Sequence, residues 1–243
     1  MKFLMGVSFF CKKVFKVNPG KKIFKAVLEK ASISTLRVAI CGGGPLAPSV
    51  FRVYQELGID FIQGYGLTET SPIIALNPVE HFKIESVGKF FAPYMDMRIA
   101  DPDENGVGEV QVKGPMVMKG YYNMPEETAE VFTEDDWVKT WDLGKLDDEN
   151  YLYHAGRAKN MIVTEGGKNV FPEEIETILG RIELIEECMV FGMPDEKDKN
   201  DLKVSVKVVY NQEVAKEKYE GKSEDELYKI IWEEIKKINL TFP

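Results

Sequence analysis

Short apolar runs alternate with amphipathic segments in the first third of the chain. Residues 36–41 form an apolar run that ends at the glycine-rich turn 42–45, and residues 59–63 form a second apolar run. Between them, residues 48–57 have the spacing of an amphipathic helix, with a proline at its start and a glycine after its end. A strand, a helix and a strand joined by tight turns are typical of a parallel α/β sheet.

The middle of the chain changes to short strands that are bounded by turns. A cluster of turn-forming residues occupies 101–106, and one helix is expected at 125–131. The expected strands are 95–99, 109–113 and 151–154. We therefore expect an α/β part at residues 1–86, followed by a β-rich subdomain at 87–158.

After residue 158 the pattern is that of a small α+β domain. Residues 161–164 and the Gly166–Gly167 turn predict a hairpin. A helix at 172–179 carries glutamates in its first turn, where they favour the helix dipole. The last predicted helix begins at Ser223, with Glu226 three residues later as a capping box. Two more strands are expected at 188–192 and 202–210. The predicted domains are thus 1–158 and 159–243.

The charge balance of the chain argues against nucleic acid as a partner. Of its 243 residues, 31 are Lys or Arg and 40 are Asp or Glu, which gives a net charge of −9. Binding to phosphate backbones needs clustered basic residues instead. The basic stretch at 12–25 leaves contact with a membrane surface open, but a solvated helix face is favoured. No apolar run of about 20 residues is present, so we expect no transmembrane helix.

Cysteines and histidines are sparse. The three cysteines show no CxxC spacing, which is typical of a reduced compartment and favours a cytoplasmic protein. His81 and His154 lack metal-ligand spacing and are interpreted as structural or surface residues. The sequence leaves the oligomeric state open.

The segment 63–70, Gln-Gly-Tyr-Gly-Leu-Thr-Glu-Thr, holds the strongest candidate chemistry. Tyr65 offers a flat face for a purine, and glycines on either side let the backbone approach a ligand closely. Thr68 can donate to a phosphate oxygen, and Glu69 can hold Mg²⁺, which prefers carboxylates together with substrate phosphates. The alternative is a glycine-bounded turn with an exposed Thr and Glu. Because the turns at 42–45 and 64–69 both follow strands, they are expected to converge on one ligand.

Four blocks of sequence occur in a known order. They are 42–46, 64–70, 114–122, and a long block from 140–142 through 156–176. Together they resemble the adenylate-forming acyl-CoA synthetase superfamily, and within it the bacterial long-chain fatty-acid–CoA ligases. The resemblance extends from about residue 36 to residue 208. It implies that a carboxylate is activated with ATP and Mg²⁺ to an acyl-adenylate, and that the acyl group then passes to coenzyme A.

The resemblance also implies roles for single residues. Tyr65 would stack on the adenine, Asp142 would accept from both ribose hydroxyls, and Arg157 would reach the ribose or a phosphate. Thr68, Glu69 and Arg157 would be catalytic, with Glu69 holding the metal. The implied nucleotide-binding set is Gly42, Gly43, Gly44, Pro45, Gln63, Gly64, Tyr65, Gly66, Thr68, Asp142, Tyr153 and Arg157. For Asp142 a turn residue, and for Arg157 a surface ion pair, remain alternatives.

Two further elements are implied by the same resemblance. Lys159 would be the hinge between the large and the small domain, because hinges are a few boundary residues that absorb a backbone change. The loop with Gly166, Gly167 and Lys168 would meet coenzyme A. The alternative for that loop is an ordinary hairpin turn.

The sequence departs from the family pattern at four points. Nothing in residues 1–39 resembles the family's phosphate loop, and the catalytic lysine near the family's C-terminus is not found before Pro243. Trp141 and Asn150 stand where the family usually has glycine; a positive φ would strain Trp141, whereas Asn tolerates it. We therefore expect the chain to be the C-terminal half of a ligase that is inactive by itself.

Three functions remain in consideration. The first is an AMP-forming long-chain fatty-acid–CoA ligase, acting on small molecules (fatty acid, ATP and CoA) and with peripheral membrane association left open. The second is an acyl–carrier-protein ligase or another acid:thiol ligase. The third is a non-catalytic nucleotide-binding module. A purely structural domain is disfavoured by the presence of Tyr65, Thr68, Glu69, Asp142 and Arg157.

Overall fold

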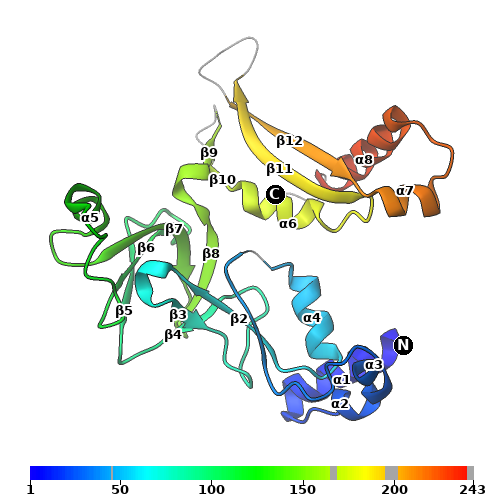
Figure 1. Cartoon of the computed structure of the whole chain (residues 1–243), viewed down its shortest axis with the longest axis horizontal. Helices are drawn as coiled ribbons and strands as arrows, with labels where there is room; N and C mark the ends of the chain where they lie inside the picture. Colours follow the sequence, from blue (N-terminus) through cyan, green and yellow to red (C-terminus); the bar gives the residue numbers. More distant parts are fainter. Residues whose placement is uncertain (45, 165–168, 195–201, 240–243) are drawn as a thin grey trace. The chain divides into compact units, whose positions relative to one another are not determined.

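A computed structural model describes residues 1–44, 46–164, 169–194 and 202–239. The chain divides into two units, Met1–His154 and Ala155–Pro243 (Figure 1). The sequence predicted a domain boundary between residues 158 and 159. This position lies a few residues after the division at His154, within the 3₁₀ turn Ala158–Asn160.

The first unit begins its sheet with the predicted strand–helix–strand. Strand β1 (Ala39–Cys41), helix α4 (Pro48–Glu56) and strand β2 (Phe61–Gly66) follow one another, and β1 pairs in parallel with β2. The register places Cys41 opposite Gln63, so that both glycine turns leave the same edge of the sheet. The parallel α/β prediction is therefore confirmed for these strands.

Strand β2 is longer than its apolar run predicted. Gly64 and Tyr65, which were expected in a loop, are paired in antiparallel fashion with Leu76 and Ala75 of β3 (Ile73–Leu76). This pairing with a distant segment keeps the backbone extended through Gly66, and nothing in the local sequence signals it. The loop prediction was wrong for residues 64–66.

One mixed sheet of eight strands runs through the whole of the first unit. Its order is β1-β2-β3-β4-β8-β7-β6-β5. The pairs β2–β3, β3–β4, β4–β8, β5–β6 and β6–β7 are antiparallel. The remaining strands are β4 (Gly88–Phe90), β5 (Asp96–Ala100), β6 (Gly108–Lys113), β7 (Val138–Leu146) and β8 (Tyr151–Arg157), and helix α5 is Pro125–Val131. A core of buried aliphatic side chains, including Ile74, Val110 and Leu152, packs on this sheet.

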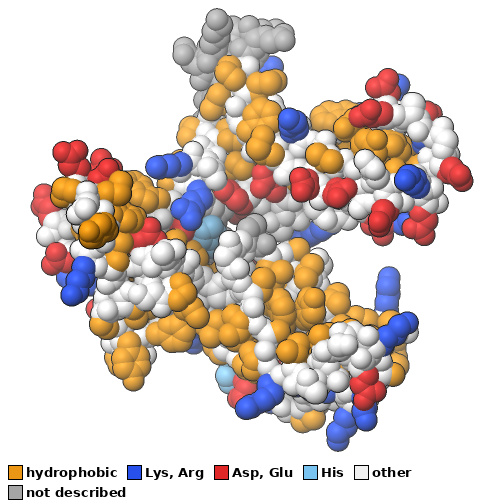
Figure 2. All heavy atoms as spheres, viewed as in Figure 1, with side chains coloured by type: hydrophobic (Ala, Val, Ile, Leu, Met, Phe, Trp, Pro, Cys, Tyr) orange, Lys and Arg blue, Asp and Glu red, His pale blue; other side chains and the backbone are white. Residues whose placement is uncertain are grey.

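Three short helices precede the sheet: α1 (Lys2–Phe15), α2 (Gly20–Ile23) and α3 (Lys25–Lys30). The solvated-face interpretation of residues 12–25 was wrong for Lys12, which is buried and forms an ion pair with Asp60 at 2.8 Å. Burial lowers the pKa of Lys12, although the Asp60 carboxylate opposes this effect. The outer side of α1 carries exposed Phe3 and Phe10, and Figure 2 shows hydrophobic and lysine side chains together over these helices.

The second unit has the predicted α+β pattern. Strands β9 (Ile162–Val163) and β10 (Asn169–Val170) form the expected hairpin, whose Gly166–Gly167 turn lies outside the described residues. Helix α6 (Pro172–Leu179) is followed by the antiparallel pair β11 (Ile185–Pro194) and β12 (Leu202–Tyr210). Helices α7 (Gln212–Lys218) and α8 (Glu224–Asn239) complete the unit.

The capping box of α8 is confirmed. The Ser223 N–H donates to Glu226 Oε2 at 2.9 Å, and Ser223 Oγ accepts from the Glu226 N–H at 3.4 Å. Leu227 and Ile231 on the inner face of α8 join the core of the second unit. Within the described parts of the chain, no helix has the length and apolar character needed to cross a membrane.

Candidate functional site

The glycine turn that begins at Gly42 follows β1 and lies against the neighbouring strand β2. A Cβ atom added to Gly42 would lie 3.1 Å from the carbonyl oxygen of Gly64. Gly43 has φ +85°, a conformation that side chains disfavour, and neither Gly43 nor Gly44 would bring a Cβ within 4 Å of another atom. Pro45 lies outside the described residues. The first turn thus presents bare backbone to open space.

Gly64 and Gly66 lie in strand β2, and glycine is needed there for a different reason. A Cβ on Gly66 would lie only 1.7 Å from the Pro72 carbonyl oxygen, and one on Gly64 would lie 2.9 Å from Leu76 Cδ1. Both glycines are therefore required by the close approach of β2 to β3, independently of any ligand. Gln63 is buried, and its carbonyl oxygen accepts from the Asn77 N–H at 2.9 Å.

After Gly66 the chain turns sharply through a 3₁₀ turn, Thr68–Thr70. Thr70 holds this turn: its buried hydroxyl accepts from the Leu67 N–H and donates to the Leu67 carbonyl oxygen at 2.9 Å. Thr68 is left exposed at the start of the turn. The sequence analysis missed the structural role of Thr70, because only the pairing of its hydroxyl distinguishes it from Thr68.

Glu69 connects this turn to the block at 114–122. Its Oε1 accepts from the Tyr121 O–H at 2.7 Å, and its carbonyl oxygen accepts from the Met118 N–H at 2.8 Å. The hydrogen bond to Glu69, followed by burial, raises the pKa of Tyr121. Tyr121 was not predicted as a site residue, although its block was. No group of three or more His, Cys, Asp and Glu side chains that could hold a metal ion occurs among the residues described. Glu69 would thus be a single protein carboxylate, which fits Mg²⁺ held largely by phosphates and water.

Asp142 is almost completely buried, with 1% of its surface exposed, on the inner side of β7. The pairing of β6 with β7 is irregular here: Glu109 lies opposite Leu143, but Gln111 lies opposite Lys139. The extra residues form a bulge that contains Trp141. Trp141 has φ +59°, the left-handed conformation expected where the family uses glycine, and Asn150 has φ +63°. The two family departures therefore stand at positions that require a positive φ.

Tyr65 and His154 lie against the Asp142 carboxylate. The Tyr65 O–H donates to Asp142 Oδ2 at 2.6 Å, and His154 Nε2 lies 3.6 Å from Asp142 Oδ1. The Tyr65 and His154 rings are 5.5 Å apart between centroids and tilted by 45°. The fold thus brings together Tyr65 and Asp142, which are 77 residues apart in sequence. It adds His154, which the sequence analysis assigned to a structural or surface role.

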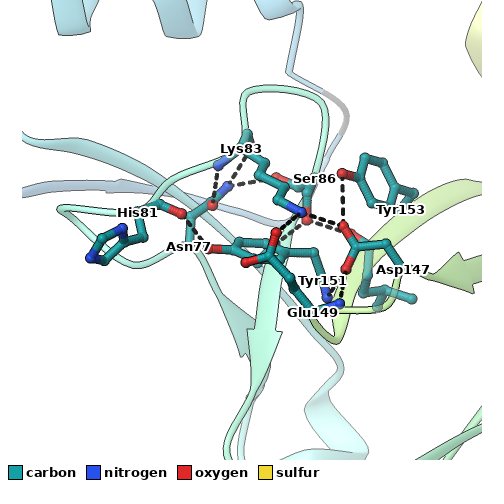
Figure 3. A network of polar contacts seen from close by, with 10 residues as sticks. Asn77, His81, Lys83, Ser86, Asp147, Glu149, Tyr151 and Tyr153 are labelled. Carbon is teal, nitrogen blue, oxygen red and sulfur yellow. Dashed lines mark hydrogen bonds and ion pairs between the residues drawn. The ribbon is translucent and has the colours of Figure 1, made fainter. Parts of the chain in front are cut away.

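Tyr153 lies in a separate polar network, shown in Figure 3. Its hydroxyl donates to Asp147 Oδ2 at 3.2 Å, and Lys83 Nζ lies 2.6 Å from the same oxygen. Lys83 also pairs with Glu149 at 2.9 Å. Partial burial by itself would raise the pKa of Asp147, but hydrogen bonds from Lys83 and from two backbone amides lower it to about 2. The Tyr153 hydroxyl is therefore bonded to Asp147, whereas the Tyr65 hydroxyl is bonded to Asp142.

The remaining predicted residues belong to the second unit. Arg157 ends β8 and Lys159 lies in the following 3₁₀ turn, and both are exposed. Beside them, Gly156 has φ +154°, and a Cβ there would lie 2.7 Å from Glu173 Oε2. Gly166, Gly167 and Lys168 lie outside the described residues.

Comparison with known proteins identifies the family. The family described as AMP-binding enzyme matches residues 1–122, which is half of the chain. The chain belongs to this family of adenylate-forming enzymes. Its mixed sheet followed by a small α+β unit is the adenylate-forming fold, present in part.

The relatives include several CoA ligases. The chain is 43% identical over 165 residues to a 2-succinylbenzoate–CoA ligase of Oceanobacillus iheyensis, covering 66% of this chain and 34% of the relative. It is 36% identical over 167 residues to the long-chain-fatty-acid–CoA ligase FadD13 of Mycobacterium tuberculosis, covering 66% and 33%.

Among solved structures, it is similar to o-succinylbenzoate CoA synthetase from Bacillus subtilis in complex with its acyl-adenylate intermediate. The TM-score is 0.67 at 30% identity, covering 88% of this chain and 43% of that one. The chain spans about a third of the length of the curated relatives it matches.

Proposed function

We propose that this chain forms the adenosine-binding part of an ATP-dependent, AMP-forming acyl-CoA ligase. The observation that carries the proposal is the buried Asp142 carboxylate, which accepts from the hydroxyl of Tyr65 at 2.6 Å. A carboxylate offers about four acceptor positions, so it can accept from both hydroxyls of a ribose while it keeps its bond to Tyr65.

The proposed chemistry has two steps. In the first, the carboxylate of the acid attacks the α-phosphate of ATP, and pyrophosphate leaves to give an acyl-adenylate. In the second, the thiol of coenzyme A attacks the acyl carbon and AMP leaves. Thr68 would donate to a phosphate oxygen, and Arg157 would stabilise the charge that develops on the phosphate. Glu69 would hold Mg²⁺, which supplies positive charge to neutralise the phosphates when it is bound.

Movement between the two steps is assigned to the second unit. Lys159 is proposed as the hinge, and Gly166, Gly167 and Lys168 as the loop that meets coenzyme A. Lys159 lies in the 3₁₀ turn Ala158–Asn160, close to the division between the two units. A small change of backbone angles at such a boundary produces a large movement of one unit relative to the other.

A long-chain fatty acid is the proposed acid, supported by the resemblance of the four sequence blocks and by the 36% identity to a long-chain ligase. An aromatic acid is the second candidate, favoured by the 43% identity to 2-succinylbenzoate–CoA ligase. Transfer to a carrier protein instead of coenzyme A is a variant of the same chemistry.

The test is calorimetric titration of the chain with non-hydrolysable sulfamoyl analogues of palmitoyl-adenylate and succinylbenzoyl-adenylate, with AMP for reference. We expect AMP and both analogues to bind, the palmitoyl analogue most tightly, and binding to be lost in Asp142→Ala. If none of the three ligands binds, or if Asp142→Ala binds as well as the wild type, the proposal is wrong. Tighter binding of the succinylbenzoyl analogue would support the aromatic acid.

A non-catalytic nucleotide-binding module is the alternative from another class. The isolated chain is expected to form no palmitoyl-CoA from palmitate, ATP and CoA, so this assay alone does not separate the two functions. Addition of the remaining two thirds of a related ligase as a second polypeptide does: formation of palmitoyl-CoA supports the ligase, and nucleotide affinity without turnover supports the module.

A further inference from the structure

Two hydrogen bonds join Glu69 to a distant segment of the chain. The Tyr121 O–H donates to Glu69 Oε1 at 2.7 Å, although the two residues are 52 positions apart in sequence. The Met118 N–H donates to the Glu69 carbonyl oxygen at 2.8 Å. Both donors belong to the segment between β6 and α5, and one fixes the side chain while the other fixes the backbone. Because a carboxylate has about four acceptor positions, the bond from Tyr121 leaves room at Glu69 for a cation.

Tyr121 is itself placed by helix α5. Its N–H donates to Thr128 Oγ1 at 2.9 Å, and the Thr128 hydroxyl donates to the Met124 carbonyl oxygen at 2.7 Å. Gly120 has φ +144°, and a Cβ there would lie 2.7 Å from Thr128 Cγ2, so the backbone before Tyr121 comes close to this helix. The Tyr121 ring also packs against the buried core of the first unit. The direction of its hydroxyl is therefore set by the scaffold before any ligand binds.

The local turn does not fix the Glu69 side chain in the same way. The 3₁₀ turn Thr68–Thr70 is held by the Thr70 hydroxyl, which bonds to the backbone of Leu67. These bonds order the backbone, but a glutamate side chain has several further rotatable bonds, and ordering them costs conformational entropy. Carboxylates that bind metal ions are commonly oriented by a hydrogen bond from a neighbouring residue, and Tyr121 supplies such a bond to Glu69.

We propose that Tyr121 is a positioning residue for the carboxylate that holds the metal ion: its hydroxyl orients Glu69 for Mg²⁺ bound together with the phosphates of ATP. This inference rests on the proposed function, in which Glu69 holds Mg²⁺. It gives the block at 114–122 a part in nucleotide binding that requires no contact between Tyr121 and the nucleotide.

The experiment measures how much Mg²⁺ adds to the affinity for ATP. Calorimetry on the full chain compares ATP with Mg²⁺, ATP with EDTA, and AMP with EDTA. The variants are Tyr121→Phe, which keeps the ring and removes the hydroxyl, Glu69→Gln, and the double variant. Tyr122→Phe is the matched control, because Tyr122 is the next residue in the chain and is 90% exposed.

We expect Mg²⁺ to raise the affinity of the wild type for ATP by about 30-fold, and Tyr121→Phe to reduce this gain by about tenfold. The affinity of Tyr121→Phe for AMP should stay within about twofold of the wild type, because AMP is measured without the metal. Glu69→Gln should abolish the gain, and adding Tyr121→Phe to it should change nothing more, because the hydroxyl acts through the carboxylate. Tyr122→Phe should behave as the wild type.

The possible failures are distinguishable. If Tyr121→Phe keeps the full gain from Mg²⁺, Glu69 is oriented without Tyr121 and the inference is wrong. If the variant weakens all three titrations equally and lowers the melting temperature without ligand, Tyr121 has a general structural role instead. If the wild type binds AMP but gains nothing from Mg²⁺, the metal role of Glu69 is wrong, and the positioning role is wrong with it. Failure of the wild type to bind any nucleotide would contradict the proposed function itself.

Discussion

Two aspartates of the first unit, five residues apart in sequence, show what separates a candidate binding carboxylate from a scaffold carboxylate. Each accepts a hydrogen bond from a tyrosine hydroxyl, Asp142 from Tyr65 and Asp147 from Tyr153. Asp147 is 26% exposed and also accepts from the Lys83 ammonium and from the amides of Glu149 and Tyr151. Asp142 is 1% exposed and lies against the Tyr65 hydroxyl and the His154 imidazole.

The difference lies in what surrounds each carboxylate. The Asp147 network connects the turn between β7 and β8 to the segment from Asn77 to Ser86, as Figure 3 shows, and its charges are matched within the protein. Asp142 is almost completely buried and accepts from the hydroxyl of Tyr65, the ring proposed for the adenine. Because adenine and ribose are joined in one nucleoside, we place the ribose at Asp142 and not at Asp147.

The same substitution at both positions should separate the two roles most strongly. Asp142→Asn is expected to weaken AMP binding by about 100-fold, because an amide cannot accept from both ribose hydroxyls as a carboxylate does. Asp147→Asn should change AMP affinity by less than about twofold, but lower the free energy of unfolding by about 1–2 kcal/mol. Calorimetry and urea unfolding measure the two effects. Equal losses of affinity in both variants would contradict the comparison.

Acid should weaken the Asp147 network. The pKa of Asp147 is lowered from 3.8 to about 2 in the folded protein. Because the folded pKa lies below the unfolded one, this group stabilises the fold above pH 4 and loses its contribution as the pH falls toward 2. We expect the free energy of unfolding to fall less steeply between pH 4 and pH 2 in Asp147→Asn than in the wild type. Parallel curves would show that Asp147 does not contribute.

The tyrosines offer a smaller contrast of the same kind. Tyr65→Phe keeps the ring but removes the hydrogen bond to Asp142, and should weaken AMP binding about three- to tenfold. Tyr153→Phe removes the hydrogen bond to Asp147 and should leave AMP affinity within about twofold of the wild type. A larger loss of AMP affinity in Tyr153→Phe than in Tyr65→Phe would support a place for Tyr153 in the nucleotide site, as the sequence resemblance implies.

The smallest expected effect concerns the bulge that carries Asp142. Trp141→Gly and Trp141→Ala both remove the indole ring, but only glycine accepts φ +59° without strain. The glycine variant should therefore be more stable than the alanine variant by about 1 kcal/mol. Urea unfolding followed by circular dichroism measures the difference. Alanine equal to or more stable than glycine would mean that the bulge relaxes when the ring is removed.

Local patterns in the sequence predicted the elements that local interactions determine. Helices 125–131 and 172–179 and the cap at Ser223 are where they were expected, because proline, glutamate and serine set helix starts within a few residues. Strands β3, β4 and β7 were missed, and β2 was cut short at residue 63. These strands are held by pairing with distant segments, which no local pattern reports.

For the candidate site, motifs predicted single residues but not how they group. The sequence indicated Tyr65 and Asp142, but their contact across 77 residues depends on the order of strands in the sheet. The contact of His154 with Asp142 was not predicted, because one histidine without metal-ligand spacing carries no signal of its own. Tyr153 was predicted for the nucleotide site from the resemblance, and the structure shows its hydroxyl bonded to Asp147. For both residues, the contacts depend on the face of the sheet on which the side chain lies, and the local sequence does not determine this.

The most direct test of this account is to map AMP binding by backbone amide NMR on the whole chain. The account predicts that titration with AMP shifts the amide signals of Gly43, Tyr65, Asp142 and His154, while those of Asn77, Ser86 and Tyr151 stay in place. Shifts centred on the Asp147 network, or no shifts at millimolar AMP, would contradict the claim that Tyr65 and Asp142 form the adenosine site.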